Sequence, residues 1–479
     1  MDKGIVLTNI TGFTLGVSFL ELSYLVAALL FVVGLKMLSH PVTARRGNLW
    51  AFGGMALAML TTLLLHKNHE GEGISLTHIW IILAAIGVGA AIGWVVARKV
   101  RMTAMPQLVS FYNATGGAAS ALVALLEFPN AAAGDIRSIL VTVLGLIIGS
   151  VAFSGSMIAY GKLDGKVGDI MKPIMTYINL ALLVITLGLG TYIVASPNPP
   201  EEMTWAIYTL FLLSLVYGVL FVMPIGGADM PVVISLLNAF TGIAAAMAGF
   251  IYNNQAMILG GILVGAAGMI LTVLMCKAMN RSLINVIIGA FGGGTSSIGG
   301  AQGAIKEITL SDAAVLLSYS RNIVIIPGYG LAAAQAQHIA QEMDELLESK
   351  GVNVRYAIHP VAVRMPGHMN VLLAEADVPY EKLVVMDDIN PDMPNVDVAI
   401  VVGANDVVNP AAYDDPESPI YGMPIIDVHL AKNIIIMKRG MGKGYAGIEN
   451  ALFFNDKTRM LFGDAKNSIQ KLVTEIKTM

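Results

Sequence analysis

The sequence predicts a polytopic, all-α membrane domain of about nine transmembrane helices, followed by a Rossmann-like α/β domain with a doubly wound parallel sheet. Only 13% of the 479 residues are charged and 56% are apolar, whereas a soluble domain carries about 25% charged residues. The charge is also uneven, with 25 charged residues among the first 290 and 37 among the last 189. We therefore expect a transmembrane domain at residues 1–282, a glycine-rich linker at 283–310 and a cytoplasmic domain at 311–479.

Composition also excludes several classes of protein. The chain has 29 basic and 33 acidic residues, for a formal net charge of −4, so the basic excess typical of nucleic-acid binding is missing. The single cysteine, Cys276, excludes an internal disulfide framework and a cysteine-built metal site.

Nine segments are apolar enough to cross a bilayer, which needs about 20 such residues per helix. They lie near residues 21–38, 49–66, 78–98, 106–126, 136–160, 173–195, 203–223, 231–252 and 255–279. Several are rich in Gly, Ala and Ser, which let helix backbones approach closely. Ten Lys and Arg residues follow the odd-numbered spans and three lie on the other side. The positive-inside rule then predicts a multi-pass protein of the inner membrane, with its N-terminus outside and its C-terminal domain in the cytoplasm.

Few polar residues interrupt the spans. They are Asn113, Ser156, Asn179 and Asn238, with Asp229 at the inner edge between the seventh and eighth spans. Each could simply make a hydrogen bond between helices. No ladder of buried acids and bases is visible, which argues against a strongly charged ion path.

The C-terminal part alternates between strands and helices, which predicts a parallel, doubly wound sheet. Strands are expected at 322–330, 352–360, 396–406 and 433–440, and helices at 332–351 and 463–477. The first strand runs into a glycine motif, Gly328-Tyr329-Gly330 with Ala333 three residues later. A strand, a GxGxxA loop and a helix in this order favour binding of a pyrophosphate.

The second strand carries the signal for the kind of nucleotide. A NAD site would place an acid near its end, but this strand ends at His359 with Arg355 and Arg364 nearby. That pattern favours a phosphorylated ribose. The pair Lys438 and Arg439, at the end of the fourth strand, could hold the 2′-phosphate or be an ordinary solvated strand end.

Eight stretches match one known family in order along almost the whole chain. They are MPQLV (105–109), GGADMPVVISLLNAFTG (226–242), CKAMNRS (276–282), PGYGLAAAQAQ (327–337), HPVAVRMPGHMNVLLAEA (359–376), GANDVVNPAA (403–412), KRGMGKGYAG (438–447) and LFFNDKTRMLFGDAK (452–466). On these stretches the chain resembles the beta subunit of proton-translocating NAD(P) transhydrogenase.

The resemblance implies that the C-terminal domain binds NADP(H) in an orientation reversed from the usual Rossmann arrangement. Its implied cofactor-binding residues are Gly328, Tyr329, Gly330 and Ala333 at the pyrophosphate, Lys438, Arg439 and Tyr445 at the 2′-phosphate, and Gly403, Asn405 and Asp406 of the GAND stretch. Asp406 would lie near the nicotinamide as the candidate catalytic residue. Arg364 would support the closed loop.

The resemblance also implies a proton path through Asn238, Asp229, Ser156 and Arg281. Many family members carry a histidine where this chain has Asn113, and asparagine does not titrate. His40, at the end of the first span, is the nearest candidate to replace it, because histidine changes its charge near neutral pH.

The implied reaction moves a hydride from NADH to NADP⁺ while protons run inward across the membrane. Only one nucleotide domain is visible, so a separate alpha subunit of one or two chains would bind NAD(H), and the alpha/beta assembly would form a dimer in membrane lipid. The main alternative is a channel or secondary transporter gated by a nucleotide-sensing domain, for which inverted repeats or broken helices are expected. A bare NADP-binding scaffold would leave the nine spans unexplained.

Overall fold

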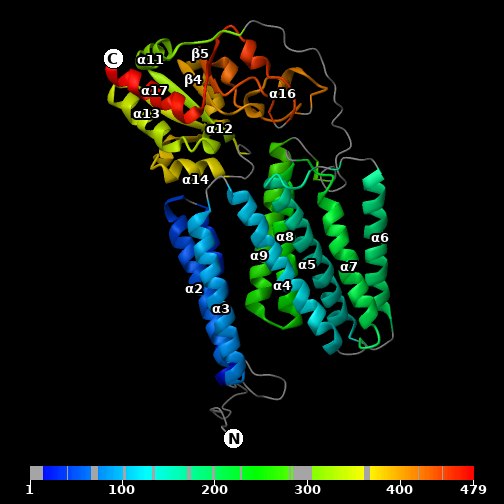
Figure 1. The fold of residues 1–479 in the computed structure, drawn as a ribbon. Helices are drawn as coiled ribbons and strands as arrows, with labels where there is room; N and C mark the ends of the chain where they lie inside the picture. The colour runs from blue at the N-terminus through cyan, green and yellow to red at the C-terminus, as the bar shows by residue number, and fades with distance from the viewer. Residues whose placement is uncertain are drawn as a thin grey trace.

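The structure is a computed structural model that describes most of the chain. The described residues are 15–39, 41–65, 74–100, 104–131, 135–168, 170, 174–196, 200–226, 229–279, 282–283, 305–360, 367–418, 420–444 and 446–479. Long helices form the N-terminal part, and the α/β domain lies beyond one end of them (Figure 1).

Nine helices within the described ranges are long and apolar enough to cross a membrane. They are α1 (Leu15–Leu38), α2 (Pro41–Leu65), α3 (Leu76–Lys99), α4 (Met105–Glu127), α5 (Ile136–Leu163), α6 (Ile174–Ala195), α7 (Thr204–Val222), α8 (Met230–Ile251) and α9 (Gln255–Ala278). The predicted membrane domain is thus confirmed. The largest difference is at α2, which begins at Pro41 rather than near residue 49, because proline is well suited to the first position of a helix and the helix extends past its apolar part.

Helices α4, α5 and α8 pack closely, and glycines lie at their contacts. A Cβ added to Gly117 of α4 would lie 2.8 Å from the carbonyl oxygen of Gly149 in α5. A Cβ on Gly242 of α8 would lie 2.5 Å from the backbone nitrogen of Gly265 in α9. The small residues therefore act as the sequence predicted, by letting backbones touch. In the most apolar 18-residue stretch of α8, 67% is buried.

Helix α3 contrasts with this core. No residue of its most apolar window is buried. A Cβ added to Gly87, Gly89 or Gly93 would meet nothing within 4 Å among the described residues. The space beside these three glycines is thus open in the described part of this chain.

The α/β domain contains a six-stranded sheet in the order β3-β2-β1-β4-β5-β6, with every pair parallel. Its strands are β1 (Asn322–Pro327), β2 (Asn353–Ile358), β3 (Leu383–Val385), β4 (Val398–Val402), β5 (Asn433–Lys438) and β6 (Thr458–Phe462). The doubly wound parallel fold is confirmed. The two strands that sequence reasoning missed, β3 and β6, are the edges of the sheet.

Two faces of the sheet carry separate cores. On one face pack α11 (Leu310–Ser318), α12 (Tyr329–Ala333), α13 (Gln337–Ser349), α14 (His368–Glu375) and α17 (Ala465–Thr478), while α15 (Met386–Ile389) and several 3₁₀ turns cover the other. The prediction of one helix at 332–351 was wrong. The helix breaks at Gln335, which has a φ of 49°, in the left-handed region that interrupts an α-helix.

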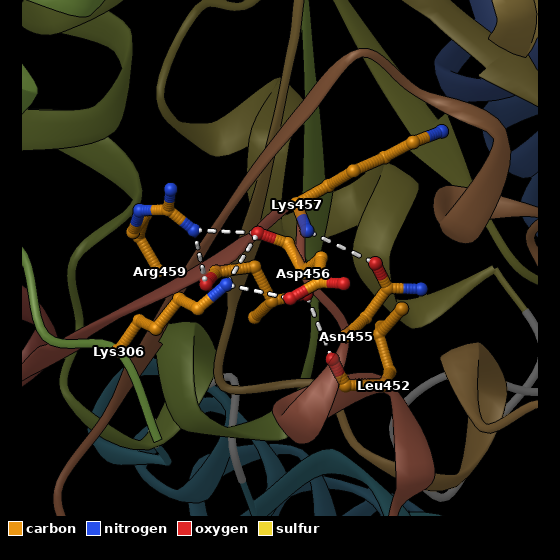
Figure 2. A network of polar contacts seen from close by, with 7 residues as sticks. Lys306, Leu452, Asn455, Asp456, Lys457 and Arg459 are labelled. Atoms are coloured by element: carbon orange, nitrogen blue, oxygen red, sulfur yellow. Dashed lines mark hydrogen bonds and ion pairs between the residues drawn. The ribbon is translucent and has the colours of Figure 1, made fainter. Parts of the chain in front are cut away.

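The start of the domain is fixed to the β6 edge by a polar network (Figure 2). The ammonium of Lys306 lies 2.7 Å from the carboxylate of Asp456, whose backbone carbonyl accepts a hydrogen bond from Arg459. Glu307 also pairs with Met460 of β6 in a parallel bridge. Residues 305–308 thus belong to the packed domain, ahead of the boundary expected at residue 311, while residues 284–304 of the expected linker lie outside the described residues.

Candidate functional site

The carboxyl ends of β1 and β4 form the switch point of the sheet, where neighbouring strands continue in opposite directions along the order. Ligands of open α/β sheets bind in the crevice at this point. Here the loop after β1, with Gly328 and Gly330, touches the loop after β4, with Gly403. The backbone N–H of Gly330 donates to the carbonyl of Gly403 at 3.0 Å, and that of Gly328 donates to the carbonyl of Val402 at 2.9 Å.

No side chain fits between these two loops. A Cβ on Gly328 would lie 2.5 Å from the backbone nitrogen of Ala404, and one on Gly330 would lie 2.6 Å from the Cα of Gly403. Gly403 itself has a φ of +65°, which favours glycine. The glycine motif therefore has a structural role that the sequence did not reveal, because it brings two crevice loops into backbone contact.

The GAND stretch after β4 is tied to the loop after β5. The carboxylate of Asp406 accepts a hydrogen bond from the backbone N–H of Ala446 at 3.0 Å, and it fills the space that a Cβ on Gly444 would need. The buried Asn450 donates to both the backbone carbonyl and the side-chain oxygen of Asn405, each at 3.1 Å. Asp406 is thus placed against the segment expected to meet the 2′-phosphate.

Positive charge gathers on that same segment. Lys438 ends β5, and its ammonium lies 4.4 Å from the centroid of the Phe453 ring and donates to the carbonyl of Gly442. Burial lowers the pKa of the Lys438 ammonium, and the nearby Asp406 carboxylate opposes that shift. Arg439 and Lys443 are exposed. These three cations together could hold an anionic group. Because Lys438 is half-buried, it is not an ordinary solvated strand end.

On the other side of the switch point, a cavity of about 290 Å³ opens at the ends of β2 and β3. His359, Met369 and Asp387 are among its lining residues. His359 is buried, and its Nε2 lies 2.8 Å from the carbonyl oxygen of Pro424. Burial lowers the pKa of this imidazole, although the hydrogen bond to Pro424 and the charge of Asp387 act in the opposite direction.

The sequence places no acid at the end of the second strand, but the fold brings one to this point. Asp387, which follows β3, lines the cavity beside His359, so the fold brings an acid there from another element. The charge of Arg355 is matched by a neighbouring acid. Arg355 lies within β2 and pairs with Asp392 at 2.6 Å. Arg364 and Tyr445 lie outside the described residues.

A second candidate site lies in the membrane part, where α4 crosses α8. The side-chain amide of Asn113 donates to the carbonyl of Ile234 at 3.4 Å, and the hydroxyl of Thr241 donates to the carbonyl of Asn113 at 3.2 Å. Ile234 and Thr241 lie four residues before and three residues after Asn238, so the three share one face of α8. The structure therefore brings Asn113 to the stretch of α8 that carries Asn238.

The third predicted polar residue lies on the neighbouring helix. Ser110, one turn before Asn113, donates to the backbone carbonyl of Ser156 in α5 at 2.8 Å. The hydroxyl oxygen of Ser156 is fully buried and has no hydrogen-bond partner in the described part of the chain. Ser110 and Thr241 were not predicted, because a serine or threonine in a membrane helix gives no distinctive pattern.

The remaining polar candidates are separate from this core or outside the described residues. Asp229 is the N-cap residue of α8, at the end of the bundle that leads to the α/β domain. Asn179 of α6 donates to the carbonyl of Leu220 in α7 at 2.9 Å, as the simple structural interpretation predicted. His40 and Arg281 lie outside the described residues.

Comparison with known proteins identifies the family of this chain. A family model described as NAD(P) transhydrogenase beta subunit matches residues 20–475. Two proteins of Rhodospirillum rubrum named NAD(P) transhydrogenase subunit beta are each 47% identical to this chain over an alignment of 463 residues, which covers 94% of this chain and 97% of the relative.

This chain belongs to the family of NAD(P) transhydrogenase beta subunits. The resemblance inferred from eight sequence stretches is thereby confirmed. Membership makes this beta subunit one part of a transhydrogenase, which implies an alpha subunit as its partner. Sequence reasoning did not single out Asp387, which lines the cavity after β2 and β3, or Asn450, which holds the loop after β4 through Asn405.

Proposed function

We propose that this beta subunit binds NADP(H) in its α/β domain and, with an alpha subunit that binds NAD(H), couples hydride transfer from NADH to NADP⁺ to inward movement of protons. The observation that carries the proposal is the meeting of two glycine loops at the switch point of the sheet. The two loops touch backbone to backbone, and the cations Lys438, Arg439 and Lys443 lie on the β5 side of this point.

The residues present fit a nucleotide with a phosphorylated ribose. Arginine can grip two phosphate oxygens at once, and lysine adds a point charge. These cations follow β5, whereas the cavity with His359 and Asp387 follows β2 and β3. Placing the 2′-phosphate on the β5 side puts the nicotinamide toward that cavity, which supports the reversed orientation. Gly328, Tyr329, Gly330 and Ala333 would lie along the pyrophosphate between the two.

When bound, NADP(H) supplies the group that accepts or donates the hydride. The chain's own residues would bind it and position it. Asn405 and Asp406 would act by holding the loop after β5, through Asn450 and Ala446. Because Asp406 contacts the loop after β5, we propose this holding role for it in place of the position near the nicotinamide that the resemblance implied, with Arg364 and Tyr445 as proposed contacts.

For the proton path, we propose the region where α4, α5 and α8 meet. Asn113, Ser156 and Asn238 come from these three helices, and the buried hydroxyl of Ser156 has no partner within the described residues. A buried polar atom without a partner is a place where a water molecule can bind. Asp229 at the start of α8, together with Arg281 and His40, would complete the path toward the α/β domain.

The helix α3 supports the proposed partner. A Cβ on any of its three glycines would meet nothing within 4 Å among the described residues, whereas Gly117 of α4, Gly149 of α5, Gly242 of α8 and Gly261 of α9 lie at backbone contacts. A membrane helix of the alpha subunit would give α3 the close neighbour that its small residues suit. We further propose the inner membrane, with the α/β domain in the cytoplasm, from the distribution of Lys and Arg, and a dimer of the alpha/beta assembly.

One experiment tests the proposal as a whole. Vesicles that contain this chain with its alpha subunit should take up or release protons while hydride passes between NADH and NADP⁺. The chain alone should bind NADP(H) and transfer no hydride between the two nucleotide pools. Robust transfer by the rigorously purified chain alone, or no transfer by the pair, would contradict the proposal.

A further inference from the structure

The last turn of α5 carries a lysine that reaches a neighbouring helix. The ammonium of Lys162 donates to the backbone carbonyl of Met223 at 2.6 Å and to that of Ile225 at 2.8 Å. Met223 is the C-cap residue of α7, and Ile225 follows it in the connection to α8. One side chain therefore joins the end of α5 to the segment that leads into α8.

Other hydrogen bonds converge on this point. The backbone N–H of Ile170, after α5, also donates to the carbonyl of Met223, at 3.3 Å. The side-chain amide of Gln107, at the start of α4, donates to the carbonyl of Leu163 beside Lys162, at 3.2 Å. The ends of α4, α5 and α7 are thus connected at the end of the bundle that leads to the α/β domain.

The charge of Lys162 suits this position for a physical reason. The last carbonyls of a helix have no partner within the helix and carry partial negative charge. Lysine offers three donors on a flexible stem. By binding two carbonyls of another chain segment, Lys162 fixes the direction in which the chain leaves α7.

The segment that Lys162 fixes leads into α8, which carries part of the polar core formed by Asn113, Ser156 and Asn238. The same segment shares a buried cluster with a cysteine. Four residues after Ile225 comes Asp229, the N-cap residue of α8, and α8 carries Asn238. Ile225 also belongs to one buried cluster with Val222, Met230 and Cys276. Cys276 is only 3% exposed and is the single cysteine of the chain.

We propose that Lys162 is a positioning residue for proton translocation, which holds the α7–α8 connection closed over this end of the bundle. By holding Met223 and Ile225, it sets where α8 begins and keeps solvent from the cluster around Cys276. Its role in proton movement rests on the proposed function. The closure itself does not, and it can be measured separately.

The sole cysteine provides that separate measurement. In membranes that contain the full chain with its alpha subunit, the rate at which a maleimide labels Cys276 reports how often the connection opens, and the two subunits are resolved by size. Hydrogen bonds of a charged group are each worth roughly a tenfold to hundredfold change in an equilibrium. Lys162→Met should therefore raise the labelling rate at least about tenfold and lower proton-coupled turnover by a similar factor, with NADP(H) affinity unchanged.

Two variants make the result specific. Lys162→Arg keeps a charged donor and should restore slow labelling and most of the turnover. Lys166→Met is the matched control, because Lys166 is exposed and forms its ion pair with nearby Asp164 at 2.6 Å, and it should behave as the wild type. If Lys162→Met does not assemble, Lys162→Gln, which keeps a donor without the charge, should show the same directions of change.

The two parts of the proposal fail in different ways. If labelling of Cys276 stays slow in the Lys162→Met and Lys162→Gln variants, Lys162 does not hold the connection, whatever happens to turnover. If labelling rises while turnover stays unchanged, the closure is real but has no role in proton movement. An inactive wild-type complex would count against the proposed function and leave the labelling result valid.

Discussion

The carboxylate of Asp406 accepts a hydrogen bond from the backbone N–H of Ala446 at 3.0 Å. These two residues come from loops that follow β4 and β5, so their contact links the GAND stretch to the loop that carries Lys438 and Arg439. The order of one loop therefore depends on the other.

Two substitutions of Asp406 should show whether NADPH binding depends on its hydrogen bond to Ala446 or on its negative charge. Asp406→Ala removes the acceptor, and a hydrogen bond to a charged group is worth about 1.5–3 kcal/mol, so NADPH should bind roughly tenfold to a hundredfold more weakly. Asp406→Asn keeps an acceptor oxygen and should bind NADPH within about threefold of the wild type. Calorimetric titration of the purified chain measures both, and equal losses in the two variants would show that the charge matters rather than the contact.

Selectivity for NADP(H) over NAD(H) should depend on Lys438 and Arg439. The 2′-phosphate carries close to two negative charges, and each charged hydrogen bond is worth about 1.5–3 kcal/mol. Lys438→Ala and Arg439→Ala should each weaken NADPH binding roughly tenfold to a hundredfold and leave NADH binding nearly unchanged. Lys471→Ala, at an exposed position on α17, is the control. An unchanged ratio of NADPH to NADH affinity would place the phosphate site elsewhere.

Gly403 should tolerate no side chain. Its φ of +65° and its backbone contact with Gly330 predict that Gly403→Ala destabilises the α/β domain by at least about 1–3 kcal/mol. Gly440→Ala is the matched control, since a Cβ there meets nothing within 4 Å. Urea unfolding of residues 305–479 compares the two, and equal stabilities would mean that the crossing of the two loops is easily rearranged.

The polar core of the membrane part should be needed for proton movement and dispensable for nucleotide binding. Asn238→Ala should lower proton-coupled turnover more than about tenfold, because it removes a polar group from the α8 face that meets Asn113, while NADP(H) affinity stays the same. Asn179→Ala removes an amide of equal size from α6, away from this core, and should leave coupling intact. Proton uptake by vesicles distinguishes them, and similar losses in both would make Asn238 merely structural.

Two acids should give the α/β domain opposite responses to pH. Burial raises the pKa of Asp344 above its usual 3.8, although its ion pair with Lys382 acts against this shift. The folded state then binds the proton more tightly than the unfolded state, so the stabilising effect of Asp344 falls as pH rises above about 4. Relative to the wild type, Asp344→Asn should therefore become more stable as pH rises.

Asp397 provides the opposite case. A hydrogen bond from Lys432, and others from the backbone N–H groups of Asn322 and Arg321, lower its pKa below 3.8. Its stabilisation is present above that value and is lost as pH falls through the lowered pKa. Asp397→Asn should thus be most destabilising at neutral pH. Urea unfolding of residues 305–479 at several pH values checks both trends, and parallel trends would contradict the assignment.

Sequence reasoning predicted the helices and the central strands because both depend on local patterns. Long apolar runs define the membrane helices, and the buried strands β1, β4 and β5 are almost entirely apolar, whereas β2 alternates between apolar and polar residues. The edge strand β3 was missed because it has only three residues, and the edge strand β6 because it begins with the polar residues Thr458 and Arg459. The break at Gln335 was missed because nothing in the surrounding alanine-rich sequence marks a left-handed residue.

Sequence motifs predicted the residues of the site, but they could not predict the contacts between those residues. The residue types at Lys438, Asp406 and Asn238 were identified from the sequence, but their neighbours depend on the fold. Asp387 reaches the cavity from α15, which follows β3, and Asn450 reaches Asn405 across 45 residues. Lys162 is one of the ten Lys and Arg residues that were used only to predict the orientation of the chain in the membrane. Its partners are backbone carbonyls, which no sequence pattern reveals.

The crossing of the two glycine loops also constrains how this family can diverge. Gly330 and Gly403 meet through main-chain atoms, and a main chain cannot shrink to admit a neighbour's new side chain. A change at one glycine therefore has no compensating change at the other. We expect homologous sequences to keep both glycines or to lose both together with the length of the two loops, so that the evolutionary history of one loop can be read from that of the other.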